Sequence, residues 1–279
     1  MQKRLSSTTL VCVLLAACGG SSSSGSAAPA PASTATPAPT TAAAATPAPA
    51  VAINYRADLV PLLVGSYSGD CSQPPALAPV ATTISVGTDG TVNAISGSGN
   101  LLASDVGLNF SKQSDTSGVQ GFVFSATLGF DTFGLIFKGQ AGAQAQGDVT
   151  SYSGTSSVVC KNSTDAGKLA TKSPFSPIEK YLTAPARDLS CIVGVSNVQT
   201  LRYQVLNGAA TLGGESYPLT SGLKTQGVLI GPVAAIGELN YLVETLDGRS
   251  LMVVLDKFGA LVQVSAKSGA GATYSCNPV

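Results

Sequence analysis

Residues 121–138 of the chain read GFVFSATLGFDTFGLIFK. Two runs within this stretch, 121–128 and 132–138, are rich in aromatic and β-branched residues, and a turn at 129–131 separates them. Such runs bounded by turn residues are typical of a β-hairpin. Helical periodicity is almost absent from the rest of the chain, so the sequence predicts a mainly β fold of antiparallel strands.

The same pattern of strands and turns occurs twice along the chain. A shift of 118 residues places three features on one another in the same order: Asp89-Gly90 on Asn207-Gly208, Phe122–Leu128 on Asn240–Leu246, and Leu135–Phe137 on Val253–Leu255. We interpret this agreement as an internal duplication of one structural unit. Convergence of two unrelated β units on similar patterns is the alternative.

Further hairpins follow from Asp-Gly turns. Thr82–Val86 and Thr91–Ile95 flank one such turn, and Tyr241–Leu246 and Ser250–Leu255 flank another. An Asp-Gly pair between alternating segments is a strong hairpin signal. The expected fold is two antiparallel β-barrel or sandwich units of about 100 residues each. The sequence does not decide whether the two units share one core.

Composition divides the chain into five parts. These are a signal peptide (1–17), a lipidated cysteine with a disordered linker (18–50), a first β domain (51–165), a junction with a short helix (166–187) and a second β domain (188–279). In the junction, Ser176-Pro177-Ile178-Glu179 fits a capping box, with Ser176 as the cap and proline in the first turn. We expect this helix to end before Pro185.

The N-terminus carries the parts of an export signal. A basic start, Lys3-Arg4, precedes an apolar run, Leu10–Ala17, that is too short to span a bilayer. The sequence Leu-Ala-Ala-Cys ending at Cys18 resembles the lipobox of bacterial lipoproteins. The resemblance implies cleavage before Cys18, acylation of that residue and attachment to a membrane through its acyl chains. Gly19 replaces the Asp that often signals inner-membrane retention in that family, which favours the outer membrane.

The segment after the lipobox is a low-complexity linker. Gly19–Ala50 contains only Gly, Ser, Ala, Pro and Thr, and such a segment cannot bury enough apolar surface to offset the entropy lost on ordering. We therefore expect a disordered spacer. Removing Lys3 and Arg4 with the signal leaves 13 of the 15 basic residues against 15 acidic ones. The remaining chain is close to neutral and has no cluster of basic residues in its sequence. We therefore expect no nucleic-acid partner.

Four of the six cysteines lie in the two predicted β domains: Cys71, Cys160, Cys191 and Cys276. An even number in an exported chain predicts disulfides, and four cysteines allow three connectivities. A metal site is the alternative, but the chain has neither a Cys-x-x-Cys spacing nor a histidine. Because one cysteine opens and one closes each copy of the repeat, we expect the bonds Cys71–Cys160 and Cys191–Cys276.

No residue pattern predicts a catalytic, cofactor-binding or metal site. The missing histidine removes the commonest general base, and the missing G-x-S-x-G motif removes the marker of α/β-hydrolases. Ser221–Lys224 fits S-x-x-K and Lys267–Gly269 resembles the K-[ST]-G of penicillin-binding enzymes. Their middle motif is missing, so we interpret the two as a turn and a loop. Asp89, Asp131 and Asp247 lie beside turns, where Asp is favoured for backbone reasons.

These observations favour a non-catalytic protein of the cell envelope. We expect a lipid-anchored binding or structural module that contacts a protein or glycan through its loops. A small β-barrel that carries an apolar ligand is the alternative, and an envelope enzyme is the third possibility. Tyr67, Tyr152 and Tyr274 lie near the paired cysteines; we expect them to pack against the disulfides, with stacking on a sugar or an apolar ligand as the other option.

Overall fold

The computed structural model of the chain describes most of the predicted β region. The described residues are 50–114, 120–128, 133–140, 146–234 and 236–279. The predicted signal, Cys18, nearly all of the predicted linker and the predicted turn at 129–131 lie outside these ranges. They stay predictions.

The described chain is mainly β, as predicted. Its helical segments are short: α1 (Arg56–Leu59), η1 (Val60–Leu62), α2 (Thr164–Gly167), η2 (Lys168–Thr171), α3 (Phe175–Leu182) and η3 (Gly231–Val233). A four-stranded sheet contains, in spatial order, β1 (Gly65–Tyr67), β4 (Ile84–Val86), β5 (Thr91–Ala94) and β6 (Gly97–Asn100).

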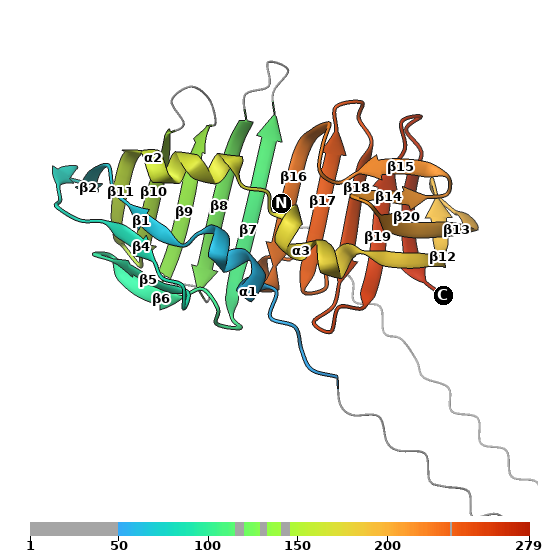
Figure 1. The fold of residues 1–279 in the computed structure, drawn as a ribbon, viewed down its shortest axis with the longest axis horizontal. Coiled ribbons are helices and arrows are strands. Elements are labelled where there is room, and N and C mark those ends of the chain that lie inside the picture. Colours follow the sequence, from blue (N-terminus) through green and yellow to red (C-terminus); the bar gives the residue numbers. More distant parts are fainter. Residues whose placement is uncertain (1–49, 115–119, 129–132, 141–145, 235) are drawn as a thin grey trace, which may run out of the picture. The chain divides into compact units, whose positions relative to one another are not determined.

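All other strands belong to one sixteen-stranded antiparallel sheet (Figure 1). One side of it contains β7 (Val106–Ser114), β8 (Gln120–Leu128), β9 (Phe133–Gln140), β10 (Gln146–Ser153), β11 (Ser156–Ser163), β2 (Asp70–Gln73) and β3 (Ala78–Pro79), in spatial order. The other side, outward from the centre, contains β16 (Leu223–Ile230), β17 (Leu239–Thr245), β18 (Ser250–Leu255), β19 (Leu261–Lys267), β20 (Thr273–Pro278), β12 (Ala184–Val193), β13 (Asn197–Leu206), β14 (Ala209–Leu212) and β15 (Glu215–Pro218).

The two sides meet at a central seam, where β7 pairs with β16. The register runs from Gln113 opposite Thr225 to Leu108 opposite Ile230. Strands from both predicted β domains therefore lie in one sheet. The sheet ends at β3 and β15, which do not pair with each other, so the described residues form no closed barrel. The barrel form of the predicted fold is wrong because β7 and β16, instead of closing their own units, pair with one another.

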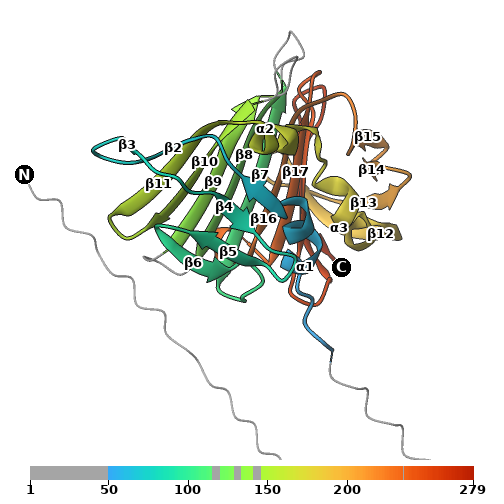
Figure 2. The same cartoon turned by 60° about the vertical axis from the view of Figure 1, so that its left-hand side comes forward.

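Alternation along the strands separates a core face of this sheet from an open face. On β9, Leu135 and Phe137 are fully buried, whereas Lys138 is exposed on the other side. Helix α2 contacts β9 and β10, and β6 contacts the same two strands, so both cover the core face there (Figures 1 and 2). Over β7–β11, no described helix covers the opposite face, which we call the open face.

The two disulfides predicted from the sequence are confirmed. Cys71 is bonded to Cys160 and Cys191 to Cys276, across sequence separations of 89 and 85 residues. In each bond the two cysteines face one another on neighbouring antiparallel strands, β2 with β11 and β12 with β20. Each disulfide therefore ties the strand that opens one side of the sheet to the strand that closes it.

The alignment of the two copies is wrong by an odd number of residues at one strand. The 118-residue shift places Phe122 and Phe124, which lie on the core face of β8, on Asn240 and Leu242 of β17. On β17 the core residues are Tyr241 and its alternate neighbours. Because side chains of a strand alternate between faces, an odd slip exchanges the two faces. The match of 135–137 with 253–255 keeps the same faces buried.

The junction helix α3 begins earlier than predicted. It spans Phe175–Leu182, so Ser176 lies inside the helix and makes no cap. Instead, the backbone N–H of Phe175 donates to Oγ of Ser173 over 3.3 Å. The predicted end before Pro185 is confirmed. Phe175 packs against Tyr241 of β17, with ring centroids 5.6 Å apart, and this contact holds the helix on the core face.

A short segment that ends at the first residue of α1 connects both sides of the sheet, and we call Ile53–Arg56 the N-terminal clasp. The backbone N–H of Ile53 donates to the carbonyl of Lys257 over 2.7 Å. The Tyr55 hydroxyl donates to the carbonyl of Asp256 over 2.7 Å, and the Asn54 amide donates to the carbonyl of Leu102 over 3.1 Å. The clasp thereby binds turns at the ends of strands from both sides of the seam.

Arg56 completes the clasp from a buried position. Its Nε donates to the carbonyl of Val106 over 2.6 Å, and Nη2 donates to the carbonyl of Ser104 over 3.0 Å. Nη1 forms an ion pair of 3.1 Å with Glu238, and the Arg56 side chain is only 4% exposed. Since Val106 begins β7 and Glu238 precedes β17, one guanidinium links the two sides.

Candidate functional site

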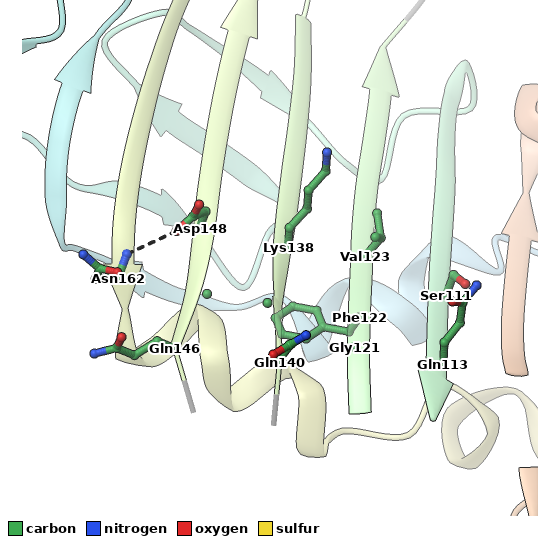
Figure 3. A pocket seen from close by; sticks show the side chains of 12 residues that line it. Ser111, Gln113, Gly121, Phe122, Val123, Lys138, Gln140, Gln146, Asp148 and Asn162 are labelled. Carbon is green, nitrogen blue, oxygen red and sulfur yellow. Dashed lines mark hydrogen bonds between the residues drawn. The ribbon is translucent and has the colours of Figure 1, made fainter. Parts of the chain in front are cut away.

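The open face contains a polar hollow over β7–β11, which we call the open-face hollow (Figure 3). Its volume is about 600 Å³. Strands β7 to β10 and the end of β11 supply its lining: Ser111, Gln113, Gly121, Phe122, Val123, Lys138, Gly139, Gln140, Gln146, Gly147, Asp148 and Asn162. Seven of these twelve residues have amide, hydroxyl or charged side chains, so the hollow offers several hydrogen-bonding groups to a ligand.

Strand register brings the lining residues together. Val123 of β8 lies opposite Lys138 of β9, and Lys138 lies opposite Asp148 of β10. These three residues share the open face because their neighbours Phe124, Phe137 and Val149 are buried on the core face. Ordinary strand alternation therefore arranges a cation, an anion and an aliphatic group in one row, as Figure 3 shows.

Gly139 leaves room for the buried ring of Phe122, which lies beneath the hollow. A Cβ on Gly139 would lie 2.6 Å from the carbonyl oxygen of Gln146 and 2.8 Å from the ring of Phe122. Only glycine lets β9 approach β10 this closely with the aromatic ring in place. A Cβ on Gly121 would meet no atom within 4 Å, so the wall beside β8 has room for a ligand.

The charged groups of the hollow balance one another. Lys138 supplies one positive charge and Asp148 one negative charge. Asp148 Oδ1 accepts a hydrogen bond of 3.2 Å from the backbone N–H of Asn162 (Figure 3), and the Asn162 amide donates to Asp70 over 3.1 Å. These bonds fix the carboxylate at the edge of the hollow. Gln113, Gln140 and Gln146 add amide groups that both donate and accept hydrogen bonds.

A second hollow of about 610 Å³ lies over β16–β20. Its lining is more apolar and includes Leu242, Met252 and Tyr274. Glu244 is also present and forms an ion pair of 3.0 Å with Lys224. The two hollows adjoin at the seam, because Gln113 of the first lies directly opposite Thr225 of the second.

Residues that the sequence associated with turns lie in turns. The Asp247 carboxylate accepts hydrogen bonds from Arg249 and from the Thr245 hydroxyl, and the bond to Arg249 is the main reason that its pKa lies well below the usual range. The pKa of Asp89 is lowered mainly by the backbone N–H of Thr91. Asp131 lies outside the described residues.

Strands β17 and β18 lie between the two segments that resemble penicillin-binding-enzyme motifs, which are at β16 and at the end of β19. Gly222 takes a positive φ of 66° in a turn, and Lys224 is engaged by Glu244. Ser268 caps its own turn by accepting from the N–H of Ala272 over 2.9 Å. Each of these contacts is local to its turn or strand pair, as expected for a turn and a loop.

The tyrosines near the cysteines take different positions. Tyr67 is buried and packs edge-on against Phe137 with ring centroids 4.7 Å apart. The ring of Tyr152 lies over Gly134, since a Cβ there would be 1.8 Å from Cζ of Tyr152. The Tyr152 ring thus packs on the neighbouring strand β9, and not on the disulfide as expected.

The open-face hollow was not found from the sequence. The only signal was the polar half of each alternating strand, such as Ser111 and Gln113 on β7 or Lys138 and Gln140 on β9. Such residues are usual on any solvated sheet face. Their grouping depends on the pairing of five strands, β7 to β11, which no single strand reveals.

The described ranges contain no group of three or more His, Cys, Asp or Glu residues placed to hold a metal ion. Nor does any helix within them combine the length and the apolar character needed to cross a membrane. Comparison of the chain with protein-family models, curated proteins and solved structures gave no match.

Proposed function

We propose that the chain is a lipid-anchored, non-catalytic protein of the bacterial envelope whose open face binds a neutral, hydroxyl-rich ligand such as a glycan. The observation that carries this proposal is the open-face hollow. It offers amide, hydroxyl, ammonium and carboxylate groups without a net charge. Amides and charged side chains recognise hydroxyl groups because they can donate and accept hydrogen bonds at fixed positions.

The arrangement of the two hollows supports an extended ligand. They lie on neighbouring strands of one sheet and adjoin across the seam at Gln113 and Thr225. Strands in a sheet are spaced by about 4.8 Å, so the ten strands from β11 to β20 give a path of roughly 40 Å. A linear oligosaccharide of several residues fits such a path better than a compact small molecule does.

The structure offers less support for a carrier of an apolar ligand. Such a carrier needs an enclosed apolar interior, as in small closed barrels. The described sheet is open, and its core face is filled by buried aromatic residues such as Phe110, Phe124 and Tyr241. The Phe110 and Phe124 rings lie 4.0 Å apart, which leaves no space between them for a ligand.

Membrane attachment is the part of the proposal that rests on the lipobox. Acylation of Cys18 would hold the protein on the outer membrane, and Gly19 favours that membrane. In the Cys18→Ala variant we expect the protein to leave the membrane fraction, because a nearly neutral chain has no electrostatic attachment of its own. Fractionation after lysis without detergent measures this. Retention of a processed Cys18→Ala chain in the membrane pellet would contradict the anchor.

We also infer that the two sides of the sixteen-stranded sheet descend from one duplicated unit. Outward from the seam, both sides have the same order of strands: five strands that follow one another in the chain, and then the strand that opens the unit in the large sheet. A disulfide joins the corresponding strands on each side. These parallels support common descent more strongly than the alignment of residues does.

A glycan-binding assay tests the proposed ligand. We expect the purified chain to bind at least one of three soluble hexasaccharides, built from α-linked glucose, β-linked glucose or N-acetylglucosamine, in isothermal titration. The double variant Gln140→Ala/Gln146→Ala should weaken that binding by about tenfold or more, since each lost hydrogen bond contributes roughly 0.5–1.5 kcal/mol.

The matched control is Asn93→Ala, which removes an exposed amide from β5 in the other sheet. It should leave the affinity unchanged. Absence of binding to all three hexasaccharides would contradict the proposed ligand class. Equal losses in the control and the double variant would place the binding site elsewhere.

A further inference from the structure

One strand of the large sheet has an open edge that differs from the other edges. Strand β13 contains ten residues, but β14 pairs only with Tyr203–Leu206. The first five residues, Asn197–Leu201, pair with β12 on one side and with no described strand on the other. We call these five residues the β13 edge. They form a free strand edge beside an otherwise continuous ladder.

The other sheet edges are short or carry charge or proline, as in soluble proteins. Strand β15 has Glu215 and Pro218 at its ends, and β3 is two residues long and ends in Pro79. In the small sheet, the edge strands β1 and β6 are three and four residues long.

Parts of β11 and β12 also lack a second described strand. On β11, these parts are Ser156–Val158 and the last two residues. The corresponding part of β12, residues 184–188, contains Pro185, Arg187 and Asp188. Short length, charge and proline all hinder pairing with another chain. The β13 edge has none of these features.

Backbone alternation shows which groups of the β13 edge are free. The carbonyl of Arg202 accepts a hydrogen bond from Gly213, so the backbone groups of Arg202 point toward the side of β14. In an antiparallel ladder every second residue points the same way. The N–H and C=O groups of Val198 and Thr200 therefore point outward on this side, whereas those of Gln199 point toward Cys191 of β12.

The side chains near this edge are uncharged, and several exposed ones are apolar. Val198 is 67% exposed, Ile192 on the neighbouring strand is 45% exposed, and Val195 at the hairpin tip is 98% exposed. From Leu189 to Leu201 the sequence contains no charged residue. An edge with exposed β-branched residues and unpaired backbone groups matches another uncharged β-strand.

We propose that the β13 edge pairs antiparallel with the same edge of a second copy of the chain. Pairing about a two-fold axis at Gln199 places Val198 of one copy opposite Thr200 of the other. Both residues have outward backbone groups, so the contact makes about four backbone hydrogen bonds. The pairing ends before Arg202, because Gly213 occupies the outward side of that residue, so no like charges meet. The same patch serves both copies, as a two-fold interface requires.

Self-pairing is favoured over pairing with a foreign peptide because the edge is complementary to itself. It has no charge to select a partner of opposite sign, and its β-branched residues, Val198 and Thr200, face one another in the two-fold arrangement. Cross-strand pairs of β-branched side chains stabilise antiparallel sheets. The sixteen-stranded sheets of the two copies are thereby joined through their β13 strands.

The mass of the purified full chain in non-ionic detergent tests the proposal. Sedimentation equilibrium with density-matched detergent should give twice the protein mass of one chain. Val198→Lys should raise the dimer dissociation constant at least tenfold, since it introduces a charge at the edge. The matched control is Leu206→Lys. Leu206 is also an exposed apolar residue of β13, at 54%, but it lies where β14 covers the edge.

Cross-linking tests the register. A mixture of Val198→Cys and Thr200→Cys chains, treated with a short bis-maleimide, should cross-link at least several-fold faster than either chain alone. Ser216→Cys on the β15 edge should not cross-link with itself. A monomeric wild-type chain overturns the proposal, including a monomer that binds a foreign strand at this edge. Equal effects of Val198→Lys and Leu206→Lys also overturn it.

Discussion

Arg56 is a buried residue that links the two sides of the large sheet. Its guanidinium binds two carbonyl groups beside β7 and the Glu238 carboxylate before β17. Replacement by alanine leaves these acceptors without their partner in a buried place, and removing one member of a buried charged pair costs roughly 3–5 kcal/mol. Glu238 is 27% exposed, so solvent reduces the loss. We expect Arg56→Ala to lower the free energy of unfolding by about 3 kcal/mol, measured by urea denaturation.

The exposed pair Arg202–Asp188 provides the comparison. Both side chains are more than half exposed, and the bond is 3.2 Å long. Surface pairs of this kind contribute about 0–1 kcal/mol, so Arg202→Ala should change stability within that range. Similar losses for Arg56→Ala and Arg202→Ala would show that the clasp does not depend on buried contacts.

The sequence predicts the contacts of a residue when its partners are close to it in the chain. Asp89 and Asp247 accept hydrogen bonds from residues two positions away, so a turn pattern suffices to place them. The cysteines were paired correctly because the repeat supplied an order. Arg56 could not be found, since its ion-pair partner lies 182 residues away and a single arginine in an apolar segment carries no pattern.

The disulfides act at the scale of the strand pair. Cys191–Cys276 joins β12 to β20 across 85 residues of chain. Cross-links that close loops this long stabilise a protein by about 2–5 kcal/mol, chiefly by restricting the unfolded chain. We expect the Cys191→Ala/Cys276→Ala variant to lose stability in that range, measured by urea denaturation of the non-reduced protein.

The Cys71–Cys160 bond encloses a loop of similar length. The Cys71→Ala/Cys160→Ala variant should therefore lose a similar amount of unfolding free energy. A change within about 0.5 kcal/mol for both variants would contradict the stabilising role. Loss of stability in only one would show that native packing, and not loop closure, determines the effect.

Strands could be predicted from alternation, but their partners could not. All three predicted hairpins are confirmed as antiparallel strand pairs, because turn and strand signals are adjacent in sequence. The seam between β7 and β16 joins residues more than 100 positions apart, and no local signal specifies it. Of the two predicted alternatives, barrel or sandwich, the barrel is wrong for that reason. The open-face hollow was missed because it depends on the same long-range order.

For the molecule as a whole, buried tyrosines couple stability to alkaline pH. Burial raises the pKa of Tyr67, Tyr203 and Tyr241 above the usual value of about 10. The unfolded chain releases these protons near pH 10, whereas the folded chain retains them. The folded state therefore binds more protons above pH 10, and its stability falls as pH rises.

We expect full stability below pH 10 and progressive loss above it. Absorbance of tyrosinate at 295 nm should rise at higher pH in the native protein than in the urea-unfolded chain. Unfolding should accompany ionisation of the buried tyrosines, which ionise last. Identical titrations of the native and unfolded chains would contradict the burial of these hydroxyl groups.

The N-terminal clasp has a mechanical consequence. Tension that reaches the folded unit from the N-terminal side of the chain acts first on Ile53–Arg56, which is held by a few hydrogen bonds and one ion pair. The seam behind it is a long ladder of paired residues. Pulling should therefore release the clasp before any strand slides. The four freed residues would add about 14 Å of extended chain, at roughly 3.5 Å per residue, while the sheet and its hollows stay intact.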